Sequence, residues 1–271
     1  MNEWRFIDSG FLDSASNMAV DEALLQCFDP ERSPPVFRIY GWEPPALSLG
    51  RFQKAGEVLD HGKCRAAGIP VVRRITGGGA IYHADELTYS LVCAPHHVPP
   101  AASIRESFRV LTSFLIRLYR GLGLDPSYAA ECSRHKSSIG ERTPFCFAGR
   151  EAYDIIVGGR KIGGNAQRRL KNIIFQHGSI PVVNRASFGA SLLLDPPEGI
   201  GDGVTSLRDL GVEESMDVLK RLMAGAFAEA LPAFLKADSL TEDERRVAAS
   251  LAREKHSCDR WVWEGADNRY P

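Results

Sequence analysis

The sequence lacks any long apolar run and any excess of one charge. Its 271 residues hold 33 Lys plus Arg against 34 Asp plus Glu, a formal net charge of −1 at pH 7. No apolar stretch approaches the roughly 20 residues of a membrane helix, and no secretory signal pattern opens the chain. Balanced charge gives no support for nucleic-acid binding through overall basicity. We therefore expect a cytoplasmic protein that binds neither membranes nor nucleic acid.

Short motifs of metal, redox and nucleotide sites are missing as well. None of the six cysteines forms a C-x-x-C pair, so we expect free thiols and no metal site. No G-x-x-x-x-G-K-[ST] or G-x-G-x-x-G context supports a P-loop or a dinucleotide-binding turn. The composition, 44% hydrophobic, is average for a globular protein. The length suits one large domain, or one domain with a small appendage.

Helical and strand patterns are present but do not alternate regularly. Helices are expected over 16–28, 56–67, 103–120, 186–194, about 215–235 and 241–256. Strands are expected at 36–42, 46–50, 70–75, 80–83, 87–94, on both sides of Gly158–Gly159, and at 173–183. Loops or turns are expected at 126–145, 168–172 and 199–211. Antiparallel strands with separate helical runs predict an α+β fold.

A run of three glycines follows the strand pattern at 70–75. Gly77–Gly79, in R-R-I-T-G-G-G-A-I-Y-H, cost backbone entropy and suit a place where a ligand or another chain approaches the backbone closely. Arg73 and Arg74 precede the run and point to opposite faces of a strand, so one can meet an anion while the other serves the structure. A plain glycine-rich hairpin with a core histidine, His83, explains these residues equally well.

Two further stretches carry candidate reactive groups. Lys161 stands before a glycine pair in G-G-R-K-I-G-G-N-A-Q, where little side-chain bulk is typical of a pocket floor. A solvated strand lysine is the usual alternative. Cys146, in T-P-F-C-F, lies outside the periodic apolar patterns that hold Cys27 and Cys93. It is therefore the candidate nucleophile, although a cysteine between two phenylalanines is more often a buried apolar group.

Together these motifs resemble the biotin/lipoate protein ligase superfamily, and in particular its lipoate-assembly branch. The resemblance rests on RRITGGGAIYH, GGRKIGGNAQRR and FQHGSI, with NMAVDEALL before them, and it covers nearly the whole chain. It implies an α+β fold, in which helices flank a mixed or antiparallel sheet and a small second sheet is present. It also implies a ligase-like catalytic domain over 1–212 and a helical C-terminal extension over 213–271 packed on it.

Within that branch, the cysteine ahead of E-A-Y-D-I-I-V-G-G-R-K resembles that of the octanoyltransferases. The resemblance implies that Cys146 and Lys161 are catalytic and that no cofactor is needed. An octanoyl group would pass from acyl carrier protein to Cys146, then to a lysine of a lipoyl-domain protein such as glycine cleavage H protein, in lipoate biosynthesis. The implied substrate-binding residues are Arg74, Thr76, Gly77, Gly78, Gly79, His83, Gly163, Gly164, Asn165 and Ala166.

Other chemistries stay open at this point. His83 or His177 can replace Lys161 as the base. An ATP- and magnesium-dependent lipoate–protein ligase would use Lys161 to hold an acyl-adenylate, and Cys146 would be incidental. An amidotransferase between lipoyl-domain proteins would use the cysteine. A lipoyl- or acyl-binding module without enzymatic activity would bind its ligand but would not catalyse acyl transfer.

A basic segment suggests where a protein partner would dock. Arg168, Arg169 and Lys171 follow the second glycine-rich motif and suit contact with an acidic acyl carrier protein. A solvated turn is the more usual explanation of such a segment.

Overall fold

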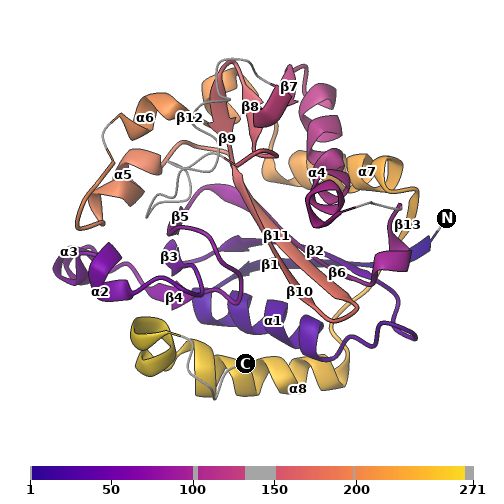
Figure 1. Cartoon of the computed structure of the whole chain (residues 1–271), viewed down its shortest axis with the longest axis horizontal. Helices are drawn as coiled ribbons and strands as arrows, with labels where there is room; N and C mark the ends of the chain where they lie inside the picture. Colours follow the sequence, from indigo (N-terminus) through magenta and orange to yellow (C-terminus); the bar gives the residue numbers. More distant parts are fainter. Residues whose placement is uncertain (1, 100–102, 132–150, 198, 266–271) are drawn as a thin grey trace.

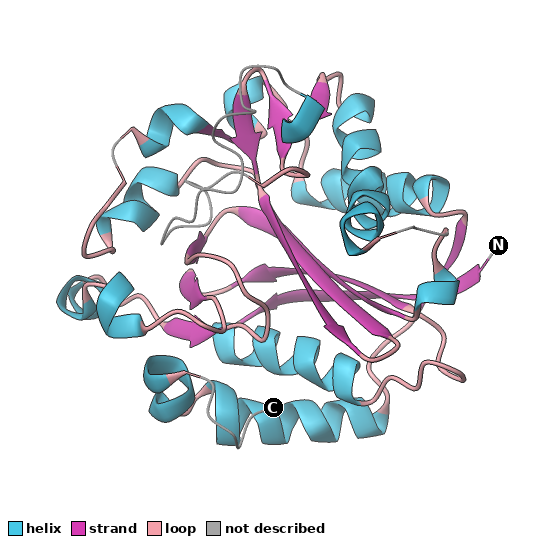
Figure 2. Cartoon of the chain, in the orientation of Figure 1, coloured by secondary structure: helices cyan, strands magenta, loops and turns pink. Residues whose placement is uncertain are grey.

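A six-stranded mixed sheet forms the centre of the molecule, and helices cover both of its faces (Figures 1 and 2). The computed structural model describes residues 2–99, 103–131, 151–197 and 199–265. In spatial order the strands are β10 (Gly164–Leu170), β11 (Ile173–Pro181), β6 (Glu86–Cys93), β2 (Val36–Trp42), β1 (Asn2–Leu12) and β13 (Ala233–Ala237). β1 runs parallel to β2 and β13, and the other neighbours are antiparallel. The expected α+β architecture with a mixed sheet is confirmed.

Two smaller sheets complete the strand arrangement. One has the order β12 (Val204–Thr205), β9 (Arg160–Ile162), β8 (Ile155–Val157) and β7 (Pro126–Tyr128). The other has the order β4 (Val71–Arg73), β3 (Ala46–Leu49) and β5 (Ile81–His83). Only Gly163 separates β9 from β10, with φ +77°, and a Cβ there would lie 2.2 Å from the Ser179 carbonyl oxygen. A glycine is therefore required where the chain passes from the second sheet into the main one.

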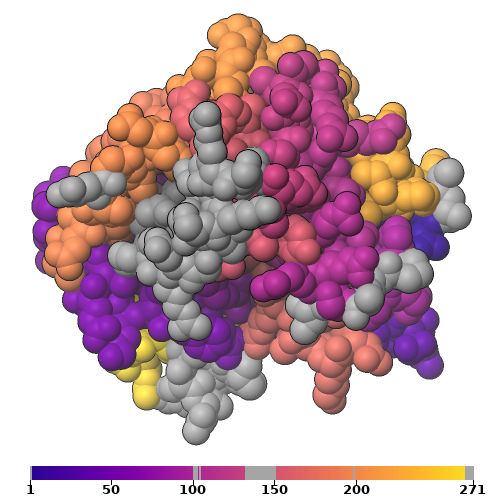
Figure 3. All heavy atoms as spheres, turned by 45° about the horizontal axis from the view of Figure 1, so that its top comes forward, coloured from indigo at the N-terminus to yellow at the C-terminus, as the bar shows by residue number. Residues whose placement is uncertain are grey.

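Two long helices, α4 (Ile104–Gly121) and α7 (Met216–Ala230), cover one face of the main sheet. The apolar stripe of α4 produces this packing, because Leu111, Leu115 and Leu118 are buried while its arginines face outward. Aromatic rings continue the contact, with Phe37 of β2 stacked on Phe227 of α7 at a centroid distance of 4.1 Å. Figure 3 shows this part of the surface, with α4 in magenta.

The opposite face carries α1 (Ser14–Gln26) and α8 (Glu242–Leu251). Thr241 and Glu244 form the capping box that starts α8, since each side chain accepts a hydrogen bond from the other's backbone N–H. Two π-helical segments follow, η5 (Ala252–His256) and η6 (Arg260–Glu264). The last part of the chain thus adds a strand beside β1 and a helix outside α1.

Several element boundaries differ from the sequence-based expectation. The helix expected at 56–67 is two short helices, α2 (Ala55–Val58) and α3 (His61–Ala66), because the backbone is extended between them and Asp60 caps the second. The turn expected at 168–172 begins only after Leu170, because β10 continues to that residue. The last part of the helix expected at 215–235 is wrong, since α7 ends at Ala230 and β13 follows.

The remaining short elements lie in connections. The segment 199–211 contains α6 (Ile200–Gly203), β12 and the 3-10 turn η4 (Arg208–Leu210), so the expectation of a loop there is wrong in part. The other short elements are α5 (Ala186–Ser191), η1 (Pro95–His97) and η2 (Ala129–Glu131). Within the described ranges, no helix has the length and apolar character needed to cross a membrane.

Candidate functional site

A narrow cavity lies between α1, the main sheet and the three-stranded sheet. Its volume is about 20 Å³, which is room for about one water molecule. Its lining residues are Met18, Tyr40, Trp42, Arg74, Ile81, His83, Thr88, Gly164, Asn165, Ala166, His177 and Gly178. The structure therefore brings together residues from both glycine-rich motifs, among them Arg74, His83 and Asn165.

The two ring nitrogens of His83 both have partners inside this wall. Nε2 lies 2.7 Å from the Ser48 hydroxyl, and Nδ1 lies 2.7 Å from Oε1 of Glu86. The Trp42 ring stacks on the imidazole at 3.9 Å between centroids. Burial alone would raise the pKa of Glu86, but His83, together with hydrogen bonds from Ser179 and Thr88, outweighs burial and lowers it. His83 is thus held in one position and orientation.

His177 joins the glycine loop to the main sheet. Its Nε2 lies 2.7 Å from the Thr76 hydroxyl, directly before the three glycines, and its Nδ1 lies 3.7 Å from Oδ2 of Asp21. Burial lowers the pKa of His177 and outweighs the opposite effect of Asp21. The imidazole is therefore neutral at neutral pH, so either nitrogen, depending on the tautomer, can accept a hydrogen bond.

Asp21 of α1 is the centre of a buried polar network. Its carboxylate lies 2.7 Å from Nη1 of Arg38 and accepts hydrogen bonds from Ser90 and Tyr40 at 2.7 and 2.9 Å. Burial would raise the pKa of Asp21, but Arg38, His177 and Ser90 together lower it. Neither Asp21 nor Arg38 was predicted from the sequence as a site residue. The available signals were a carboxylate within the apolar pattern of α1 and an arginine in the middle of a strongly apolar strand.

The two arginines before the glycine loop separate as strand alternation predicted. Nη2 of Arg74 donates to the carbonyl oxygens of Gly77 and Gly79 at 3.1 and 2.9 Å, so this side chain supports the loop from within. Arg73 points the other way and donates to the carbonyl oxygens of Trp261 and Val262 at 2.8 and 2.7 Å. Burial, with a smaller effect of the Arg74 charge, lowers the pKa of Arg73 to about 10. Arg73 therefore joins the C-terminal segment to the base of the glycine loop.

Glycine is also required at Gly50, in the turn after β3 that faces the glycine loop. Gly78 has φ +96°, and a Cβ on Gly50 would lie 1.9 Å from the carbonyl oxygen of Gly78. The glycine loop and the turn after β3 thus approach each other at backbone distance, as the sequence pattern suggested.

Lys161 is buried at the junction of the second sheet with β10. Its Nζ lies 2.7 Å from Oδ2 of Asp154, and the residue is 2% exposed, which excludes the solvated strand lysine. The hairpin turn at Gly158–Gly159 places Lys161 beside Ile156. Lys161 does not line the narrow cavity.

Cys146 lies outside the described residues, so its position relative to Lys161 is not part of this structure. The four described cysteines, Cys27, Cys64, Cys93 and Cys258, are free thiols. Among the described residues, no group of three or more His, Cys, Asp or Glu side chains is arranged to hold a metal ion.

A chain of amide groups crosses the sheet and ends at the cavity. Nε of Arg169 donates to Gln167 at 3.1 Å, Gln167 donates to Gln176 at 3.0 Å, and Gln176 donates to the Tyr89 hydroxyl at 3.0 Å. The Tyr89 hydroxyl then donates to Oδ1 of Asn165 at 2.7 Å. Because a guanidinium can only donate, the direction of every bond in the chain is determined. Oδ1 of Asn165 is therefore fixed toward the Tyr89 hydroxyl, and this fixes the orientation of its Nδ2 donor as well.

The basic segment at 168–171 does not form one surface patch. Arg168 and Arg169 occupy opposite faces of the edge strand β10, and both are half-buried. Arg169 is bound to Gln167, whereas Lys171 is exposed in the turn after the strand.

Comparison with known proteins identifies the family. Residues 13–228 match the family model described as the lipoyl protein ligase A/B catalytic domain. The chain belongs to this family, as the three motifs implied. An octanoyltransferase LipM of Geobacillus kaustophilus is 35% identical, over 95% of this chain and 97% of that protein. An octanoyltransferase LipM of Bacillus subtilis is 34% identical, over 96% and 98%. The chain is therefore an enzyme of the acyltransferase class.

Solved structures support the same assignment of the fold. Lipoate-protein ligase A bound with ATP has a TM-score of 0.81 at 27% identity, covering 96% of this chain and 98% of that one. The putative lipoate protein ligase Ta0514 of T. acidophilum, with bound lipoic acid, has a TM-score of 0.79 at 26% identity, covering 96% and 99%.

Proposed function

We propose that this acyltransferase moves an octanoyl group from acyl carrier protein to a lysine of a lipoyl-domain protein in lipoate biosynthesis. The observation that carries the proposal is the similarity, over nearly the full length, to enzymes named octanoyltransferase. The likeness to a lipoate protein ligase with bound lipoic acid supports an eight-carbon acyl chain as the cargo.

In the first half-reaction, the thiolate of Cys146 attacks the carbonyl carbon of the octanoyl thioester. The bond between that carbon and the carrier's sulfur breaks, a new thioester forms on Cys146, and the carrier's thiol takes up the proton that Cys146 released. A buried ammonium on Lys161 stabilises the thiolate. Asp154 supports this role because its carboxylate, 2.7 Å from Nζ, favours the charged lysine. Backbone N–H groups of 163–165 are the proposed oxyanion donors.

In the second half-reaction, the amine of the acceptor lysine attacks the thioester on Cys146. An amide forms, the sulfur of Cys146 leaves, and the proton released by the amine passes through Lys161 to that sulfur. No ATP is consumed, because the donor thioester already supplies the activation.

The acyl chain binds along the narrow cavity, whose apolar wall includes Met18, Trp42 and Ile81. A cavity of about 20 Å³ is far smaller than an octanoyl chain, so these side chains must move apart when the chain enters. Arg74 and His83, which line the wall, keep the substrate-binding role expected from the sequence. The same role is proposed for Thr76, Gly77, Gly78, Gly79, Gly163, Gly164, Asn165 and Ala166.

Intact-mass measurement after mixing with octanoyl-acyl carrier protein, without ATP, tests the proposal. We expect the protein to gain the mass of one octanoyl group, and Cys146→Ser to lose both the adduct and transfer to a lipoyl domain. Cys27→Ser is the matched control and should retain both, since Cys27 is a free thiol on α1's C-cap. Normal transfer by Cys146→Ser would refute the cysteine mechanism.

An ATP-dependent lipoate–protein ligase is the second candidate, favoured by the likeness to ligase A bound with ATP. Lipoate-dependent release of pyrophosphate, with no transfer from acyl carrier protein, would establish it instead. Transfer from a lipoylated or octanoylated protein donor alone would establish the amidotransferase. The cytoplasmic location and the division at residue 212 remain predictions.

A further inference from the structure

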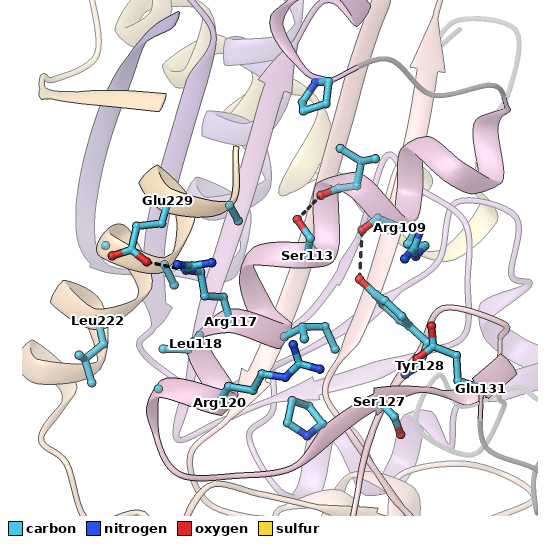
Figure 4. Close-up of a pocket in the computed structure, with 18 of the residues that line it drawn as sticks. Arg109, Ser113, Arg117, Leu118, Arg120, Ser127, Tyr128, Glu131, Leu222 and Glu229 are labelled. Atoms are coloured by element: carbon cyan, nitrogen blue, oxygen red, sulfur yellow. Dashed lines mark hydrogen bonds and ion pairs between the residues drawn. The ribbon is translucent and has the colours of Figure 1, made fainter. Parts of the chain in front are cut away.

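A wide groove of about 1020 Å³ lies between α4, α7 and β7 (Figure 4), on the side of the molecule away from α1 (Figure 1). Its floor is largely apolar and includes Val110, Leu118, Pro126, Leu222 and Ala226. Leu222 is 39% exposed and contributes apolar surface to the floor that faces solvent. An apolar floor open to solvent suits a surface that another protein covers.

Positive charge surrounds this floor. Four arginines line the groove against two glutamates, Glu131 and Glu229. Arg117 reaches across to Glu229 of α7, with 2.5 Å between Nε and Oε2 (Figure 4). The other three, Arg109, Arg120 and Arg221, are exposed and make no ion pair with any described residue. The groove therefore has three guanidinium groups available to a partner.

We propose that this groove, formed by α4, α7 and β7, docks the acyl carrier protein that donates the octanoyl group; this inference rests on the proposed function. The match is one of charge, because acyl carrier proteins are acidic and three available guanidiniums attract and orient acidic side chains. Bidentate pairing of guanidinium with carboxylate adds directionality. The apolar floor receives the side chains between the partner's carboxylates.

The groove and the cavity lie on opposite sides of the main sheet, and side chains of α4 and the sheet connect them. The inner side of α4 presents Phe114, whose ring centroid lies 5.0 Å from that of Tyr89 in the main sheet. The hydroxyl of Tyr89 in turn donates to Asn165 at the cavity wall. A carrier protein holds its acyl group on a long flexible arm, so its docking surface need not adjoin the cavity.

The basic segment suggested by the sequence is a weaker docking surface. Arg169 donates to Gln167 and Arg168 lies on the opposite face of β10, so Lys171 is the one exposed cation of the three. The arginines of the groove, by contrast, come from two packed helices and surround a common floor.

Steady-state kinetics with two donors test the inference. We expect Arg120→Glu/Arg221→Glu to lower kcat/KM for octanoyl-acyl carrier protein by about 10-fold or more, mainly through KM. With octanoyl-pantetheine, a small thioester that needs no docking, kcat/KM should change by less than about twofold. Added salt should weaken the wild-type reaction with the carrier more than that of the variant.

Lys171→Glu is the matched control and should leave the kinetics with the carrier unchanged. Thermal unfolding of each variant shows whether the fold is retained. An unchanged KM for the carrier in the groove variant, a larger effect from Lys171→Glu, or an effect on the acceptor's KM alone would overturn the inference.

Direct binding separates this inference from the proposed function. If neither donor supports turnover by the wild-type enzyme, the proposed function fails, and binding of octanoyl-acyl carrier protein is measured by calorimetry. Binding that is lost in Arg120→Glu/Arg221→Glu then still supports the groove. Equal binding by both proteins, or none by the wild type, overturns it.

Discussion

The narrow cavity beside α1 and the wide groove between α4 and α7 lie on opposite sides of the same sheet. Around the cavity, Asp21, Arg38 and His177 are buried, and Asp21 pairs with Arg38 at 2.7 Å and lies 3.7 Å from His177. Around the groove, Arg120 and Arg221 are exposed. Buried charges are costly to separate, whereas exposed charges contribute little to stability. Charges near the cavity therefore hold the fold and the site, and those of the groove are available for recognition.

The largest expected effect follows from breaking the network at Asp21. In Asp21→Ala the guanidinium of Arg38, which is 0% exposed, loses its buried carboxylate partner. The free energy of unfolding should fall by about 3–5 kcal/mol, measured by urea denaturation. Asp21→Leu/Arg38→Met removes both charges and should recover most of that loss. A loss below about 1 kcal/mol in Asp21→Ala would show that the buried charges are not needed for stability.

Acid should weaken the same side of the molecule through Glu22. Burial alone would raise its pKa, but His256 and Lys255 outweigh burial and bring it from 4.5 to about 2. Because the folded pKa is lowered, the stabilisation is complete above pH 4.5 and is lost as the pH falls toward 2. It amounts to about 3 kcal/mol in unfolding free energy. In denaturation series from pH 6 to 2, Glu22→Gln should reduce the loss of unfolding free energy at low pH. Glu57→Gln, at an exposed carboxylate, should not.

A smaller loss of stability is expected from breaking the row of side-chain hydrogen bonds that ends at Asn165. Tyr89→Phe removes the hydroxyl that accepts from Gln176 and donates to Asn165. The free energy of unfolding should fall by about 1–2 kcal/mol, because two partners lose a hydrogen bond. Octanoyl transfer should fall in kcat more than in KM, since Asn165 is no longer oriented. Arg169→Lys retains a donor at the far end of the chain and should keep more activity than Tyr89→Phe; the reverse order would contradict this interpretation.

The smallest effect is expected in the groove. Arg109→Ala and Arg221→Ala should each change the free energy of unfolding by less than about 0.5 kcal/mol, because neither side chain is paired with a described residue. Urea denaturation checks this. A loss of about 2 kcal/mol would mean that these arginines support the fold and would remove the contrast with the cavity.

Local signals predicted much of the fold. The glycine pair at 158–159 predicted the hairpin of β8 and β9, and the apolar period of α4 located the helix within one residue at each end. β1 was missed because only Trp4 and Ile7 of its 11 residues are buried, so no clear alternation is visible. β13 was missed because A-F-L-K-A continues the apolar pattern of α7, and its pairing with β1 depends on residues over 200 positions away.

Sequence motifs predicted which residues line the site, but they did not predict the contacts between those residues and the rest of the fold. The glycine-rich segments pointed to Arg74, His83 and Asn165, which line the cavity. No local pattern joins Asp21 to His177, or Lys161 to Asp154, because these contacts depend on how separate strands and helices pack. Burial decided the interpretation of Lys161, since a strand lysine is usually solvated, whereas this one is 2% exposed.

The place of β1 in the sheet has a consequence for how the protein is made. β1 leaves the ribosome long before one of its two neighbours, β13, with which it pairs. Until residues 233–237 are synthesised, the β13-facing side of β1 has unpaired N–H and C=O groups. Growing chains therefore expose an unpaired strand edge during translation. Association between nascent copies should begin at this edge.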